Sequence, residues 1–272
     1  MIKQLPNIFT LLNLFFGCIA IVYILQSGLM PVYKQTEQGF IVADVNDFGN
    51  QYVAIPEQII KASLFIGLAA IVDFFDGFVA RLLKSSSELG KQLDSLADVV
   101  SFGVAPAIIV YQFLRLSYAQ QEDGLNVNTL WLLPAFIIPC AGAYRLARFN
   151  IDASQSSVFK GVPIPAAGLM LASLPLSYWF THSVWQIRLL QNKWFWYAVI
   201  LVVSYLMVST LPMLALKFKR LNLQSLLPFI VIAVIGIVAI IFLQWFAVPV
   251  IFAAYVIVSI IMLKTKPNKP NA

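Results

Sequence analysis

The sequence predicts an all-α polytopic membrane protein, and three observations support that prediction. Of the 272 residues, 60% are apolar and only 11% are charged. The mean hydropathy is +0.84, far above that of a chain whose surface faces water. A helix that crosses a bilayer needs about 20 predominantly apolar residues. The chain offers such stretches repeatedly, separated by short polar or basic connections, and they leave little room for a soluble domain.

Reading the apolar runs against their flanks, we expect eight membrane-spanning helices, over residues 8–26, 59–83, 93–116, 129–149, 162–180, 194–216, 226–246 and 247–263. The last two runs are nearly continuous. Only Pro249 and the aromatic pair Trp245 and Phe246 indicate a tight hairpin between them, so six or seven spans remain possible.

These spans divide the chain into three parts. Residues 1–216 form a membrane core, which includes a polar connection over 28–58 that is too hydrophilic to cross the bilayer. Residues 217–263 form a C-terminal transmembrane hairpin, and residues 264–272 form a basic tail that we expect to be disordered.

Basic residues are distributed unevenly between the two ends of the predicted helices. With eight spans, thirteen of the eighteen Lys and Arg residues fall on one side. Because Lys and Arg accumulate in cytoplasmic loops, this side and both termini are predicted to be cytoplasmic. The net charge of +6 favours anionic headgroups and phosphates at the membrane surface and gives no reason to invoke nucleic acid.

Four aspartates occupy positions that a spanning helix should avoid. The chain has twelve acidic residues, and Asp73, Asp76, Asp94 and Asp98 all fall in apolar stretches, where each charge costs roughly 3 kcal/mol at the helix centre. Each pair is spaced three or four residues apart and therefore shares one helix face. The short polar linker over 84–92 makes the two helices antiparallel neighbours. Four carboxylates are thus predicted to meet in one cavity near the cytoplasmic surface.

Such a cluster needs cations, because four adjacent carboxylates repel one another. Hard oxygen ligands select Mg²⁺, Mn²⁺ or Ca²⁺, so a paired-metal site follows. Nearby residues suit a phosphate ligand: Gly77, Ala80 and Gly90 allow close approach, and Arg81 adds a bidentate cation. Helix packing or a structural Asp–Arg pair explains any one of these residues equally well. Packing alone is a poor explanation of the whole pattern.

The pattern DxxDGxxARx8GxxxDxxxD, which covers the 26 residues from Asp73 to Asp98, resembles the signature of the CDP-alcohol phosphotransferase family at every specified position. The resemblance implies a six-helix membrane core, usually dimeric, that binds two divalent metal ions, Mg²⁺ or Mn²⁺. It also implies roles for single residues: metal ligands at Asp73, Asp76, Asp94 and Asp98, general base at Asp98, and contacts to the cytidine diphosphate from Asp73, Gly77, Ala80, Arg81 and Gly90.

Further segments are similar to members of the family that use serine as the acceptor: LPNIFTLLNLFFG, SFGVAPA, RLARFN and GVPIPAA. The resemblance then implies transfer of the phosphatidyl group of CDP-diacylglycerol to the hydroxyl of L-serine, with release of CMP. Arg145 and Arg148 share a helix face at the cytoplasmic end of the fourth span, where they could hold the serine carboxylate or the lipid phosphate. Asn150 could add a hydrogen bond. Alternatively, both arginines simply mark the positive-inside rim.

Two other functions remain open. The same chemistry could use glycerol 3-phosphate, inositol phosphate or another alcohol, although a phosphorylated acceptor would require a further basic cluster. Clustered intramembrane carboxylates also mark cation transporters and channels. Transporters tend to show broken helices and repeated halves, and we find neither in the sequence. The family resemblance further leads us to expect a homodimer in the bacterial inner membrane, with the active site facing the cytoplasm.

Overall fold

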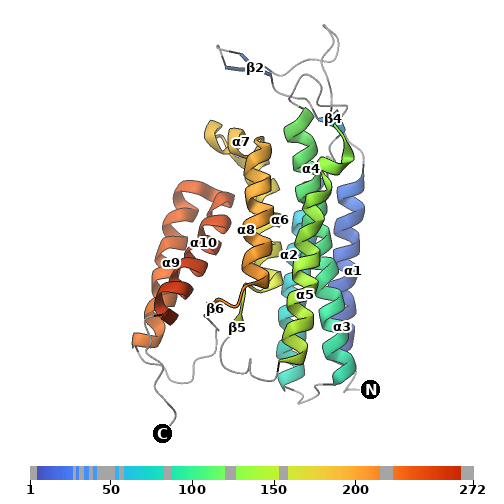
Figure 1. Ribbon diagram of the computed structural model, residues 1–272, viewed down its shortest axis with the longest axis vertical. Helices are drawn as coiled ribbons and strands as arrows, with labels where there is room; N and C mark the ends of the chain where they lie inside the picture. The colour runs from blue at the N-terminus through green and yellow to red at the C-terminus, as the bar shows by residue number, and fades with distance from the viewer. Residues whose placement is uncertain are drawn as a thin grey trace.

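The protein is a bundle of long, nearly parallel and antiparallel helices, seen in a computed structural model (Figure 1). The structure describes residues 5–26, 29–30, 34–36, 39–41, 53–54, 58–82, 87–119, 127–152, 159–214 and 223–264. Four segments within these ranges are long and apolar enough to cross a membrane, and two shorter apolar helices accompany them. The predicted all-α polytopic membrane fold is confirmed.

Six helical segments, one of them a continuous run of three elements, form the core of the bundle. Their bounds are α1 (Leu5–Leu25), α2 (Ile59–Leu82), the continuous run of α3 (Glu88–Asp98), η2 (Val99–Val104) and α4 (Ala105–Ala119), then α5 (Ile137–Ile151), α6 (Ile164–Phe180) and α8 (Lys193–Val208). The predicted six-helix core therefore exists. The η2 segment is a π-helical turn that directly follows Asp98. Turns of this kind occur frequently at functional sites.

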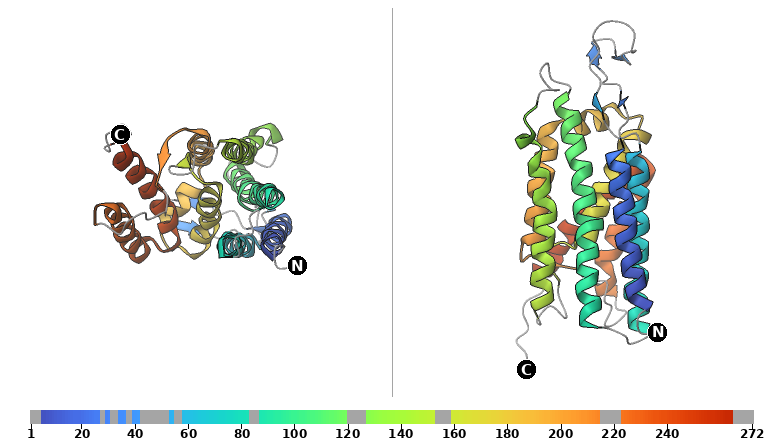
Figure 2. Two further views of the ribbon diagram at one scale, coloured as in Figure 1. Left: turned by 90° about the horizontal axis from the view of Figure 1, so that it is seen from below. Right: turned by 90° about the vertical axis from the view of Figure 1, so that its right-hand side faces the viewer.

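The last two helices, α9 (Leu223–Leu243) and α10 (Ala247–Lys264), fold back on each other beside α6. A 3₁₀ turn, η7 (Gln244–Phe246), reverses the chain between them, and Gln244 adopts a left-handed φ of 51° there. The reversal confirms the hairpin indicated by Trp245, Phe246 and Pro249. Figure 2 shows this hairpin at one edge of the bundle, across the core from α1.

Short elements occupy the two ends of the bundle. At the end opposite the termini lie the antiparallel strand pairs β1 (Leu29–Met30) with β4 (Val53–Ala54) and β2 (Lys34–Thr36) with β3 (Gly39–Ile41). The 3₁₀ turns η4 (Thr129–Trp131) and η5 (Leu133–Phe136) precede α5, and α7 (Val184–Leu190) joins α6 to α8. Toward the other end, β5 (Phe159–Lys160) pairs with β6 (Pro212–Met213).

Helix ends differ from the predicted spans where a local signal overrides the apolar run. The span predicted to begin at residue 93 begins at Glu88, because the Ser87 side chain accepts a hydrogen bond from the Gly90 N–H (3.0 Å) and caps the helix. The span predicted to end at 216 ends at Val208, since Pro212 lacks an N–H and its segment pairs as β6 instead. The predicted division at residue 216, residues 265–272 of the basic tail predicted over 264–272, and most of the connection over 28–58 lie outside the described residues. Lys264, the first residue of that predicted tail, is the last residue of α10.

Close helix packing positions the site-bearing helices. A Cβ added to Gly168 of α6 would lie 2.7 Å from the carbonyl oxygen of Phe102 in η2. A Cβ on Gly142 of α5 would meet the Ile164 side chain, and one on Gly17 of α1 would meet Ser101. Small residues at such crossings let membrane helices approach closely, where lipid supplies no hydrophobic drive for association. The π-helical turn also contacts α5 directly, so it is held between α1, α5 and α6.

Candidate functional site

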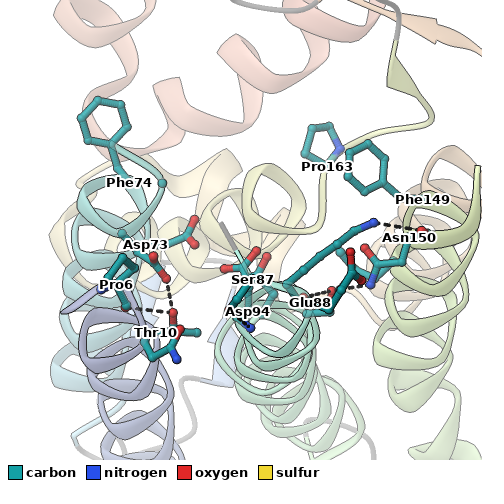
Figure 3. Close-up of a pocket in the computed structure, with 18 of the residues that line it drawn as sticks. Pro6, Thr10, Asp73, Phe74, Ser87, Glu88, Asp94, Phe149, Asn150 and Pro163 are labelled. Atoms are coloured by element: carbon teal, nitrogen blue, oxygen red, sulfur yellow. Dashed lines mark hydrogen bonds between the residues drawn. The ribbon is translucent and has the colours of Figure 1, made fainter. Parts of the chain in front are cut away.

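A cavity of about 840 Å³ opens at the end of the bundle where α1 begins, α2 ends and α3 begins. Four helices and the segment before α6 line it. Its lining residues are Pro6, Asn7 and Thr10; Asp73, Phe74, Asp76 and Gly77; Ser87, Glu88, Gly90, Lys91, Asp94, Ser95 and Asp98; and Arg145, Leu146, Phe149, Asn150 and Pro163. Figure 3 shows Asp73 and Thr10 on one side of this space and Phe149, Asn150 and Pro163 on the other.

The four predicted aspartates all line this cavity. Asp73 comes from α2, and Asp94 and Asp98 come from successive turns of α3. One carboxylate oxygen from each of these three residues lies within 4.8 Å of the other two. Asp76, one turn beyond Asp73 and 7% exposed, accepts a hydrogen bond from the Thr10 hydroxyl. All four residues thus line one cavity, as the sequence predicts, but only Asp73, Asp94 and Asp98 form the cluster within 4.8 Å.

The donor set fits a divalent cation. Carboxylate oxygens are the ligands that Mg²⁺ and Mn²⁺ prefer, and three of them leave coordination positions for water or phosphate oxygens. Within the part of the chain that the structure describes, none of the three carboxylates forms an ion pair with Lys or Arg. Asp98 is 7% exposed. Asp73 and Asp94 are partly buried. Carboxylates at this spacing, with no ion pair among the described residues, form a cluster that could hold a metal ion.

Helix α1 supplies a polar stripe that sequence reasoning missed. Asn7, Thr10 and Asn13 recur every three residues in an otherwise apolar span. Asn7 and Thr10 line the cavity, and the Asn13 side-chain amide donates to Asp98 Oδ1 at 3.3 Å. The regular spacing of three polar residues within an apolar span is the signal that could have found them, because such residues share a helix face.

Arg145 and Arg148, predicted to act together, have separate surroundings. Arg145 lines the cavity, is 5% exposed, and its Nε has no hydrogen-bond partner. Arg148 does not line the cavity. Its guanidinium donates to the carbonyl oxygens of Val208 (2.8 Å) and Ser209 (3.0 Å), which are left free at the end of α8. Arg148 therefore joins α5 to α8, whereas Arg145 faces the cavity.

Asn150 also lines the cavity, but it already links two helices. Its side-chain amide donates to Ser95 Oγ at 2.8 Å, and its backbone carbonyl oxygen accepts from Lys91 Nζ at 2.9 Å. Both partners belong to α3, so Asn150 fixes the end of α5 against the helix that bears Asp94 and Asp98.

The predicted nucleotide contacts are placed in part. Gly77 lines the cavity, and a Cβ added there would meet nothing within 4 Å. Gly90 lines it from α3, and a Cβ added there would lie 3.0 Å from Asn7 Oδ1 and 3.1 Å from Ser87 Oγ. Ala80 and Arg81 belong to α2, but their side chains lie outside the described residues. Open space beside Gly77 leaves room for a ligand next to Asp73 and Asp76.

A helical membrane bundle with an acidic cavity at one end defines an integral membrane protein with a polar ligand site. Comparison with known families makes the class specific. The CDP-alcohol phosphatidyltransferase model matches residues 3–191, so the chain belongs to that family. The match includes all four aspartates and ends before α8, α9 and α10.

Several curated proteins are similar to this chain. Three named CDP-diacylglycerol–serine O-phosphatidyltransferase come from Bacillus subtilis (40% identical over 43% of this chain and 62% of that protein), Mycobacterium leprae (31%, over 77% and 64%) and Saccharomyces cerevisiae (40%, over 40% and 39%). The matched part of the chain thus spans less than two thirds of the length of these relatives.

Proposed function

We propose that the protein transfers the phosphatidyl group of CDP-diacylglycerol to the hydroxyl of L-serine, giving phosphatidylserine and CMP. The observation that supports this most directly is the meeting of Asp73, Asp94 and Asp98 within 4.8 Å in a cavity that Asp76 also lines. The family match covers these residues, and relatives that share 31% to 40% identity are named for serine transfer.

Asp73, Asp76, Asp94 and Asp98 would hold two divalent cations, Mg²⁺ or Mn²⁺. When bound, such cations neutralise a diphosphate and stabilise the departing CMP, the main electrostatic task in phosphoryl transfer. The chain itself contributes the carboxylate oxygens that would hold these cations, and the cavity beside them has room for the diphosphate. Gly77, Ala80, Arg81 and Gly90, together with Asp73, would contact the cytidine diphosphate.

Asp98 acts as the general base in this proposal. Its carboxylate takes the proton of the serine hydroxyl while that oxygen attacks the lipid-bearing phosphorus. The bond between this phosphorus and the CMP oxygen breaks in the same displacement, so no enzyme nucleophile is required. Asp98 suits the task because it lines the cavity deep in the bundle, where water is largely excluded.

Arg145 is the proposed anchor for the acceptor carboxylate or the lipid phosphate. A guanidinium binds either group bidentately, and Arg145 is a buried cation with no ion pair or hydrogen bond among the described residues. Asn150 would act mainly by holding α5 to α3. The contacts of Arg148 favour a structural role over substrate binding.

The proposal also includes the orientation of the protein in the membrane. The cavity lies at the end of the bundle where α1 begins and α2 ends, and Figure 1 shows that α10 ends toward the same side. The distribution of basic residues predicts this side to be cytoplasmic. The protein would act in a bacterial inner membrane as a homodimer, with α9 and α10 as a hairpin added to the core.

Incorporation of radiolabelled serine into lipid tests the proposal. Purified protein, CDP-diacylglycerol and Mg²⁺ or Mn²⁺ should give labelled lipid and CMP in equal amounts, and chelation should abolish both. CMP release with glycerol 3-phosphate but not with serine would instead identify another acceptor. Ion flux into proteoliposomes without any CMP release would identify a transporter.

A further inference from the structure

A polar contact behind the carboxylate cluster has no part in the chemistry described so far. Asn13 lies in the middle of α1, is 0% exposed, and does not line the cavity. Its side-chain amide reaches across to the α3 helix and donates to Asp98 Oδ1 at 3.3 Å. A carboxylate only accepts hydrogen bonds, so the amide nitrogen must be the group that faces it.

This contact differs from the buried hydroxyl contacts that stay within a single span. Ser63 of α2 donates to the Ile59 carbonyl at 3.2 Å, and Ser117 of α4 donates to the Phe113 carbonyl at 2.8 Å. Both bonds stay within one helix and satisfy a hydroxyl locally. Asn13 instead bonds a side chain on another helix and leaves its own Oδ1 without a partner. Local satisfaction of a buried polar group therefore does not account for Asn13.

The backbone at Asn13 is fixed to the segment that follows Asp98. Ser101 in the π-helical turn donates from its hydroxyl to the Asn13 carbonyl at 3.0 Å. One turn further along α1, Gly17 packs directly on Ser101, where a Cβ would overlap the hydroxyl. The amide donor of Asn13 is thus held at a set height and angle relative to Asp98.

We infer that Asn13 is a positioning residue that holds one oxygen of Asp98 so that the carboxylate presents a fixed geometry to the divalent cation. The inference rests on the proposed metal role of Asp98. Hydrogen bonds to metal-binding carboxylates orient them, and loss of such a partner typically weakens metal affinity about 10- to 100-fold. Asn13 itself touches neither substrate nor ion.

Direct Mn²⁺ binding tests this inference without any substrate. In Asn13→Leu, which keeps the number and branching of side-chain heavy atoms but has no donor, the dissociation constant for Mn²⁺, measured by electron paramagnetic resonance, should rise about 10- to 100-fold. Ser117→Ala removes a buried hydroxyl elsewhere in the same helical run and should leave Mn²⁺ affinity unchanged. Wild-type affinity in a folded Asn13→Leu protein would overturn the inference.

A second variant covers the case in which Asn13→Leu does not fold. In Asn13→Thr, the shorter hydroxyl can bond the carbonyl one turn earlier in α1, as Ser63 does in α2, and it falls short of Asp98. This variant should fold and still lose Mn²⁺ affinity by about 10-fold or more. Unchanged affinity in Asn13→Thr would equally overturn the positioning role.

The activity readout separates positioning from general damage. Asn13→Thr should need about 10- to 100-fold more Mn²⁺ for half-maximal activity, while its KM for CDP-diacylglycerol stays near the wild-type value. A loss of active protein would lower kcat and leave the Mn²⁺ dependence unchanged. If the wild-type protein binds Mn²⁺ but transfers no serine, the proposed function fails while the binding comparison between variants still decides the role of Asn13.

Discussion

The cavity end of α1 to α3 and the hairpin of α9 and α10 are both apolar membrane segments, yet they use their few polar residues differently. In the hairpin, Tyr255 Oη donates to the Leu214 carbonyl at 3.1 Å, and Ser259 Oγ accepts from the Leu214 N–H at 3.3 Å. These bonds attach α10 to the backbone of the residue that follows β6. Around the cavity, Thr10 and Asn13 bond the carboxylates of Asp76 and Asp98.

The comparison teaches how to interpret a polar residue in a spanning helix. A polar side chain that bonds only backbone groups stabilises the fold. A polar side chain that bonds a charged side chain at a cavity indicates a functional site. The family match agrees with this division, since it includes the aspartates and stops before the hairpin. Substitutions in the two regions test this difference. Their expected effects range from loss of activity to a small change in stability.

The largest effect is expected at the carboxylate cluster. Asp98→Asn keeps the shape of the side chain but removes both its charge and its capacity to take a proton. CMP release should fall by about 1000-fold or more, measured with CDP-diacylglycerol, serine and Mg²⁺. Asp152→Asn is the matched control, because Asp152 pairs with Lys160 at 3.0 Å outside the cavity. Equal losses in both variants would contradict the proposed division.

Arg145 and Arg148 offer a contrast within one helix. Arg145→Met should lower kcat/KM for serine by about 10- to 100-fold, the loss expected for a hydrogen-bonded charge pair with substrate. Thermal stability should not fall, since Arg145 has no ion pair or hydrogen bond among the described residues. Steady-state kinetics with serine as the varied substrate, together with thermal unfolding in detergent, check both parts.

Arg148→Met should give the opposite result. It removes hydrogen bonds to the carbonyls of Val208 and Ser209, so the free energy of unfolding should fall by about 2 kcal/mol. The KM for serine should stay near its wild-type value. If Arg148→Met lowered kcat/KM for serine more than Arg145→Met does, both arginines would belong to the acceptor site, as the sequence predicts.

Substitutions at two glycines distinguish a glycine that leaves room for a ligand from one that allows close helix packing. Gly77→Leu would extend into the cavity, because a Cβ there meets nothing within 4 Å. It should raise the KM for CDP-diacylglycerol about 10-fold, a loss of about 1.4 kcal/mol in binding, at unchanged stability. Gly168→Ala would press on the backbone of Phe102 at 2.7 Å. That change should lower stability by about 1–3 kcal/mol through overpacking, and the reverse assignment of effects would contradict the account.

The smallest effect is expected in the hairpin. Tyr255→Phe removes the hydrogen bond to the Leu214 carbonyl, which is worth about 1 kcal/mol. The melting temperature should fall slightly, and kcat/KM for both substrates should not change. A tenfold fall in kcat/KM for serine would show that the hairpin contributes to the site and would dissolve the contrast between the two regions.

The sequence predicts the charged half of the site well, because intramembrane aspartates are costly and their spacing fixes the helix face. It also predicts the hairpin from Trp245, Phe246 and Pro249. Three features escape it, because each depends on a partner distant in sequence. Asn13 meets Asp98 across 85 positions, Arg148 meets carbonyls left free only because α8 ends at Val208, and the π-helical turn is held by helices on several sides.

Anomalous scattering from crystals grown with Mn²⁺ tests the central claim most directly. The account predicts a strong manganese peak within coordination distance, about 2.2 Å, of oxygens from Asp73, Asp94 and Asp98, and no such peak in Asp98→Asn crystals. A wild-type structure at saturating Mn²⁺ with those carboxylates turned toward separate partners and no peak between them would contradict it.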